Sequence, residues 1–215
     1  TLRLCRDDED RLLAALIGLD FHTMTLMWLS LALWFLGDVE QSTDQARLAL
    51  SLAQKRAVPL TWATAMAMVI WLWLYSGSDE DVRPWVETLQ RLVDENRIEL
   101  LRPWAGTHYG WLLAGRGQVA EGVAQMRRNI LNWRQGSTAL GRPMLLAALA
   151  QVCLEAALYG EGLRAVDEAL DLLKQGFGRA VEAELHRLQG ALLLKTGDGH
   201  PEMAAAAFQK AFEIA

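Results

Sequence analysis

Cysteine and proline are scarce in this chain. Two cysteines, Cys5 and Cys153, occur in 215 residues, which is too few and too widely spaced for a disulfide framework or a cysteine-built metal site. We therefore expect a reducing, cytoplasmic compartment. All prolines fall at or near expected helix starts, where the missing N–H costs little: Pro59, Pro84, Pro103, Pro143 and Pro201.

Dense basic clusters and nucleotide-binding loops are missing as well. Lys and Arg number 21 against 26 Asp and Glu, and no stretch concentrates them, which disfavours a nucleic-acid partner. The phosphate-loop pattern GxxxxGK[ST] does not occur. We expect no cofactor, no bound metal and no catalytic set.

Charge is absent from two long runs, 57–78 and, with His22 counted as neutral, 21–37. At a rise of about 1.5 Å per residue, the run at 57–78 is long enough to cross a bilayer. It also contains Pro59, Thr61 and Thr64, and it falls in register with the repeat described below. We interpret it as a buried helix, with a membrane span as the alternative.

What the chain does contain is an internal period. Small residues, with Val82 as the bulkiest exception, recur early in each second expected helix at steps of 40, 40, 40 and 42 residues. A fixed period in this range predicts a stack of helical hairpins, each too small to bury its own apolar face. The residues at this position are Ser42, Val82, Gly122, Gly162 and Ala204.

The expected helices follow from this period. Short turns that mostly contain Gly join them, so consecutive helices should be antiparallel. We predict an all-α fold in one domain, 1–215, built as a right-handed superhelical stack of about five hairpins. The expected repeats are 21–58, 59–98, 99–138, 139–177 and 178–215, after a preceding helix within 1–20. The expected helices are 7–18, 21–36, 39–56, 60–75, 80–96, 99–114, 118–135, 141–157, 161–175, 179–195 and 201–215.

The first helix of each hairpin carries its own small residue, and this pattern resembles the tetratricopeptide repeat in a longer, 40-residue form. Gly110 and Gly190 occupy that position, whereas Ile70 departs from it. Ser30 and Ala150 substitute there in the other repeats.

A closer resemblance covers nearly the whole chain. It rests on segments 18–20, 28–37, 122–129 with Trp133, 140–143, 182–190 and 207–215. These are similar to the C-terminal helical-repeat regions of bacterial adenylate/guanylate cyclase-like proteins and related predicted signalling ATPases. In that family a cyclase or regulator domain and a nucleotide-binding domain precede the repeats. The resemblance implies that this chain is the sensing or docking end of such a protein. The missing initiator Met and an end within a helix also indicate a fragment of a longer protein.

In tetratricopeptide stacks the first helix of each hairpin lines a concave groove. Trp suits such a groove, since it combines an apolar body with one hydrogen-bond donor, and we expect Trp71 and Trp111 to line up along one wall. The alternative is that these aromatic side chains fill the core between hairpins. The expected groove residues are Met27, Leu31, Trp34, Trp71, Tyr75, Trp104, Thr107, His108, Trp111, Gln151 and Glu155.

The leading functional hypothesis is a non-catalytic interaction or scaffold module of a bacterial signalling protein. It would bind a peptide, a protein or its own catalytic domains in the groove, with no nucleic acid or membrane as partner. The apolar first two repeats also favour a homodimer. One alternative is a small-molecule effector sensor that controls an attached cyclase or ATPase.

A helical enzyme is the other alternative. His108 has the chemistry of a general base, but no nucleophile with an orienting acid lies near it in register. Glu182 and His186 share a helix face at i, i+4 spacing, yet two ligands do not make a metal site.

Overall fold

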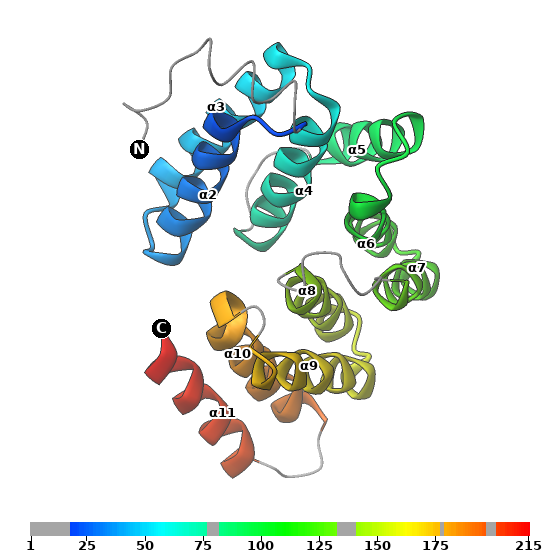
Figure 1. Ribbon diagram of the computed structural model, residues 1–215. Coiled ribbons are helices and arrows are strands. Elements are labelled where there is room, and N and C mark those ends of the chain that lie inside the picture. Colours follow the sequence, from blue (N-terminus) through cyan, green and yellow to red (C-terminus); the bar gives the residue numbers. More distant parts are fainter. Residues whose placement is uncertain (1–17, 77–81, 133–140, 177–178, 197–200) are drawn as a thin grey trace. The chain divides into compact units, whose positions relative to one another are not determined.

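The computed structural model describes residues 18–76, 82–132, 141–176, 179–196 and 201–215 (Figure 1). Within these ranges the chain forms ten α-helices and no strand, which confirms the all-α expectation. The chain divides into two compact units, Thr1–Ala105 and Gly106–Ala215, and each is described by itself. The helix expected at 7–18 lies outside the described residues except for Gly18.

The described part of the first unit consists of four α-helices, a short 3-10 turn, η1, and the first residues of the helix that follows. Helix α2 packs on α3 and α4, α3 packs on α4, and α4 packs on α5 and η1. The elements are α2 (Phe21–Phe35), α3 (Val39–Arg56), α4 (Pro59–Ser76), α5 (Arg83–Glu95) and η1 (Glu99–Leu101).

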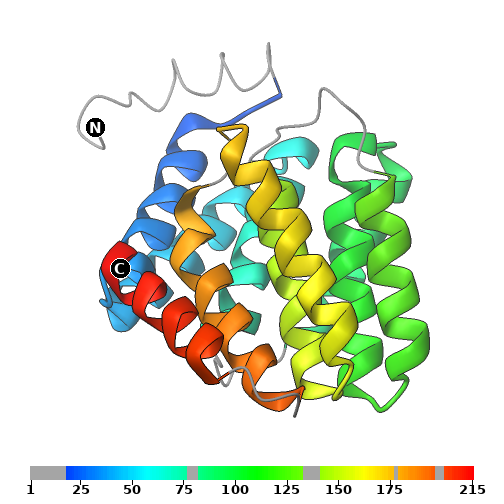
Figure 2. The same cartoon turned by 90° about the horizontal axis from the view of Figure 1, so that it is seen from below.

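The division between the units falls within α6, and the second unit continues from there to α11. Helices α7, α8, α9, α10 and α11 each pack on the next, and α8 also packs on α10; Figure 2 shows the last three side by side. The elements are α6 (Arg102–Gly115), α7 (Val119–Leu131), α8 (Gly141–Glu155), α9 (Tyr159–Lys174), the 3-10 turn η2 (Arg179–Val181), α10 (Glu182–Lys195) and α11 (Pro201–Ile214).

Helix ends follow local chemistry, and for this reason they lie close to the bounds expected from sequence. The Asp20 carboxylate accepts a hydrogen bond from the Thr23 N–H at 2.7 Å and so caps α2. Helix α3 ends at Arg56 and is capped by Ala57, whose backbone is left-handed (φ 53°) and whose N–H donates to the Ala53 carbonyl. Helices α4 and α11 begin at Pro59 and Pro201.

The first hairpin crosses at its two small residues, whereas in the second Val82 lies just before α5 rather than inside it. In the first hairpin the Ser42 hydroxyl donates to the Ser30 carbonyl at 2.7 Å, and both serines are buried. Small side chains at the crossing let two helix backbones approach closely, which is what the recurring small residues predict.

Helix α4 lies wholly within the uncharged run at 57–78 and is the core helix of the first unit. Its middle is sealed from solvent, since Met66, Ile70 and Trp71 are all 0% exposed. Among the described helices, none combines the length and the apolar character that a membrane crossing requires.

Candidate binding site

The residues expected in the groove lie mostly inside the protein. Burial therefore favours the alternative, in which these side chains fill the core and contribute packing energy. Trp34, Tyr75 and Gln151 are half-buried and Glu155 is exposed. The buried residues are Met27, Leu31, Trp71, Trp104, Thr107, His108 and Trp111.

Three of the expected aromatic residues do come together, across α2 and α4. The Trp34 ring meets Trp71 edge-on with centroids 5.6 Å apart, and Tyr75 lies 4.7 Å from Trp71. Such contacts stabilise packing beyond simple burial. Trp71 belongs to the first unit and Trp111 to the second, so the shared wall expected of them stays a prediction.

Two of the polar residues expected in the groove, Gln151 and Glu155, also come together at the surface of α8. The Gln151 amide donates to Glu155 at 2.6 Å and accepts from Arg187 of α10 at 3.1 Å. Arg187 in turn pairs with Glu184 at 2.6 Å. Equivalent helices of two successive hairpins therefore share one polar surface network.

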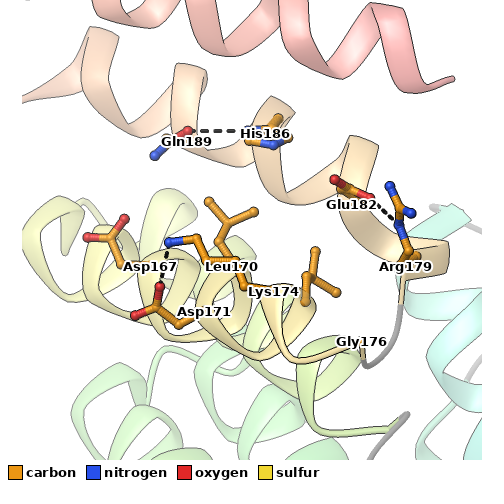
Figure 3. Close-up of a pocket in the computed structure, with 10 residues that line it drawn as sticks. Asp167, Leu170, Asp171, Lys174, Gly176, Arg179, Glu182, His186 and Gln189 are labelled. Atoms are coloured by element: carbon orange, nitrogen blue, oxygen red, sulfur yellow. Dashed lines mark hydrogen bonds and ion pairs between the residues drawn. The ribbon is translucent and has the colours of Figure 1, made fainter.

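A pocket of about 770 Å³ lies between α9 and α10. This volume falls in the range typical of ligand sites. Figure 3 shows side chains from both helices around it. Leu170 and Leu173 supply apolar surface, and charged groups surround them. The lining residues are Asp167, Leu170, Asp171, Leu173, Lys174, Gly176, Arg179, Glu182, His186 and Gln189.

Two ion pairs border the pocket, one within α9 and one between the 3-10 turn η2 and the start of α10 (Figure 3). Lys174 donates to Asp171 at 2.8 Å, and this hydrogen bond raises the pKa of Lys174. Arg179 donates to Glu182 at 3.0 Å. The cationic side chains are 76% and 78% exposed. Exposed pairs of this kind contribute little to folding, so a ligand can exchange them for contacts of its own.

His186 and Glu182 both line the pocket, but they point to different partners. His186 Nδ1 lies 3.4 Å from Gln189 Oε1, whereas Glu182 pairs with Arg179. The described part of the chain contains no group of three His, Cys, Asp or Glu side chains arranged to hold a metal ion.

The buried Cys153, which does not line the pocket, is not a reactive thiol. Burial raises the pKa of Cys153 to about 12, which keeps its thiol protonated at neutral pH.

Sequence reasoning missed most of the pocket. The sequence singles out only the Glu182–His186 pair, because the other lining residues are ordinary surface types whose closeness depends on how α9 meets α10. The i, i+3 spacing of Asp171 and Lys174 was a usable signal for a helix-surface pair. That signal does not indicate a cavity.

Sequence reasoning also missed an ion-pair network that joins side chains of α7, α8 and α9. Arg127 donates to Glu161 at 2.9 Å and to Glu168 at 3.0 Å, and Arg142 donates to Glu168 at 2.7 Å. Burial alone would raise the pKa of Glu161, but hydrogen bonds from Arg164 and Arg127 outweigh it and lower the pKa. Arg127 and Glu168 are 41 residues apart, so a search for opposite charges one period apart would have found them.

The chain matches no family model, no curated protein and no solved structure. The functional argument therefore rests on the residues and geometry described above.

Proposed function

We propose that this chain is a non-catalytic helical-repeat module that binds a segment of peptide or protein, with the pocket between α9 and α10 as a contact site. The observation that carries the proposal is the make-up of this pocket: apolar surface from Leu170 and Leu173, bordered by exposed ion pairs. A peptide can place an apolar side chain against the leucines. Its charged groups can then exchange with Lys174 and Arg179 at small cost.

The arrangement of the hairpins belongs to the same proposal. We propose a tetratricopeptide-like, right-handed stack with a period of about 40 residues. Packing of the second helix of one hairpin on the first helix of the next supports it, as in α3 on α4, α7 on α8 and α9 on α10. Contacts between successive first helices, α2 with α4 and α8 with α10, support it further.

The cellular setting rests on the sequence resemblance. We propose that the module belongs to a cytoplasmic bacterial signalling protein of the cyclase-like or ATPase group, and that its partner is another protein or a domain of the same protein. The surface network of Gln151, Glu155, Arg187 and Glu184 supports an interaction role, because it gives two successive first helices one continuous polar face.

A peptide selection tests the proposal. A display library is selected on the intact chain and counter-selected on a Lys174→Glu/Arg179→Glu variant, whose exposed side chains leave the core untouched. We expect enriched peptides that carry an acidic residue next to an apolar one. If the enriched peptides bind the variant as well as they bind the native chain, the pocket is not the binding site.

A second candidate function is the sensing of a small effector, because a pocket of about 770 Å³ can also hold a metabolite. A thermal-shift screen separates the two candidates, since a ligand that binds only the folded state raises the melting temperature. A metabolite that raises it for the native chain and not for the pocket variant would favour the sensor. Under the peptide-binding proposal, selected peptides raise it and metabolites do not.

A further inference from the structure

The pocket between α9 and α10 has one more carboxylate than it has basic side chains. Its lining contains three acidic residues and two basic ones. Arg179 pairs with Glu182 at 3.0 Å, and Lys174 pairs with Asp171 at 2.8 Å. The third acidic residue, Asp167, is exposed and takes part in no hydrogen bond or ion pair among the described residues. The excess negative charge of the pocket therefore belongs to Asp167.

Asp167 and Arg179 lie at opposite ends of the pocket. Figure 3 shows Arg179 next to Gly176 at one end and Asp167 on the side of Gln189 at the other, with Leu170 between them. The helix rises about 10 Å from Asp167 to Lys174, and Arg179 follows beyond the end of α9. A ligand that fills the pocket therefore meets a carboxylate at one end, apolar surface in the middle and a guanidinium at the other end.

Lys174 does not neutralise Asp167. The Lys174 ammonium donates to Asp171, and this hydrogen bond is the main cause of its raised pKa, to which the charge of Asp167 adds less. The Lys174 side chain is 76% exposed, so water screens its attraction to a second carboxylate. In addition, each basic group that an acidic ligand takes over leaves one more carboxylate of the pocket without its partner. A ligand that binds here therefore gains from carrying a positive charge of its own.

Gln189 offers a backbone contact at the same end as Asp167. Its Oε1 lies 3.4 Å from His186 Nδ1, and its side chain is half-buried. Because the amide oxygen faces the imidazole, the amide NH₂ group can donate to a peptide carbonyl. Such a hydrogen bond would fix the position of the peptide along the pocket beside Asp167, so that one side chain of the peptide regularly meets the carboxylate.

We propose, as a refinement that rests on the peptide-binding function above, that the pocket selects peptides by the order of their charges. An acidic residue binds at the Arg179 end, an apolar residue lies on Leu170 and Leu173, and a basic residue binds Asp167. Asp167 is then the specificity-determining residue, because it attracts a basic side chain and repels an acidic one at the same position. An extended peptide advances about 3.3 Å per residue, so the acidic and basic residues stand about four positions apart.

A charge swap between peptide and protein tests this selection. The probes are two forms of one peptide selected on the native chain, with lysine or glutamate at the fourth position from its acidic residue, beyond the apolar one. Calorimetry measures both against the native chain, Asp167→Lys, Asp167→Asn and the control Glu213→Lys, which makes the same charge change at an exposed position of α11 outside the pocket.

We expect the native chain to bind the lysine form at least about threefold more tightly than the glutamate form, as suits a pair of exposed charges. Asp167→Lys should reverse this preference, and Asp167→Asn should remove most of it. Glu213→Lys should keep the native preference. The reversal is a readout that a loss of folding cannot produce, because the variant must still bind one form of the peptide.

Three results would overturn the inference: equal affinity of the native chain for both forms, a preference that Asp167→Lys leaves unchanged, or an equal reversal in Glu213→Lys. The last would assign the preference to the net charge of the chain. These failures differ from failure of the proposed function, in which the selected peptides bind Lys174→Glu/Arg179→Glu as well as they bind the native chain. In that case the peptides bind outside the pocket, and the role of Asp167 is refuted with it.

Discussion

Gly110 and Gly122 bring α6 and α7 together at backbone distance. A Cβ on Gly110 would lie 2.7 Å from the Gly122 carbonyl oxygen, and one on Gly122 would lie 2.4 Å from the Gly110 carbonyl oxygen. Real Cβ atoms do not approach a backbone oxygen so closely. The crossing therefore requires glycine on both helices, which explains the small residues that recur at this point of the hairpins.

Gly122→Ala should destabilise the second unit by roughly 1–3 kcal/mol, because the added methyl forces two backbones apart. This outweighs the gain of about 1 kcal/mol that alanine brings to a helix interior. Gly160→Ala in α9 is the matched control, since only the mobile end of Arg164 lies within 4.0 Å of the new methyl. Urea denaturation followed by circular dichroism measures both. Equal stability of the Gly122 variant and the native chain would refute the close crossing.

Arg56→Met should cost about 3–5 kcal/mol of stability, because it leaves the Asp20 carboxylate buried without its cation. The Asp20 side chain is 0% exposed and that of Arg56 is 10% exposed. Adding Asp20→Asn should recover part of the loss, since the amide oxygen still accepts the Thr23 N–H. Thermal unfolding of the single and double variants measures this coupling.

Arg47→Met is the control for Arg56→Met, because it removes an arginine from an exposed ion pair instead of a buried one. Arg47 and Asp44 are 3.9 Å apart and their side chains are 57% and 66% exposed. A change within about 0.5 kcal/mol is expected for such a surface site. A loss at Arg56 no greater than the loss at Arg47 would mean that the buried pair does not stabilise the first unit.

Glu161 should make stability depend on pH on the acid side. Its pKa in the folded protein lies below the ordinary value of 4.5. The stabilisation is therefore complete above that value and is lost as the pH falls from 4.5 through the lowered pKa. Glu161→Gln should flatten this part of the stability curve. Melting temperatures recorded from neutral to acidic pH decide the matter, and identical curves for the native and Glu161 chains would contradict the prediction.

The order and bounds of the helices could be predicted from sequence because they depend on local signals. Asp20, Ala57 and Pro59 act within one turn of the helix that each begins or ends. The spacing of Ser30 and Ser42 reports the crossing of one hairpin, which is also short-range.

The binding surface could not be predicted in the same way. A Trp at a given register position packs inside or faces solvent according to which helices surround it, and Trp71 is 0% exposed while Trp28 is 52% exposed. The pocket depends on how the end of α9, near Lys174, meets the 3-10 turn at Arg179 and the start of α10. Side chains that are unremarkable along the chain become a site only through that contact.

Calorimetric titration of one selected peptide tests the central claim, that this chain binds a peptide segment between α9 and α10. Titrations compare the native chain, Lys174→Glu/Arg179→Glu and the control variant Lys195→Glu/Lys210→Glu, which carries the same charge change outside the pocket. We predict that the pocket variant binds at least about tenfold more weakly, a loss of about 1.4 kcal/mol, and that the control binds like the native chain. Equal affinity of the pocket variant and the native chain, or an equal loss in both variants, would contradict the account.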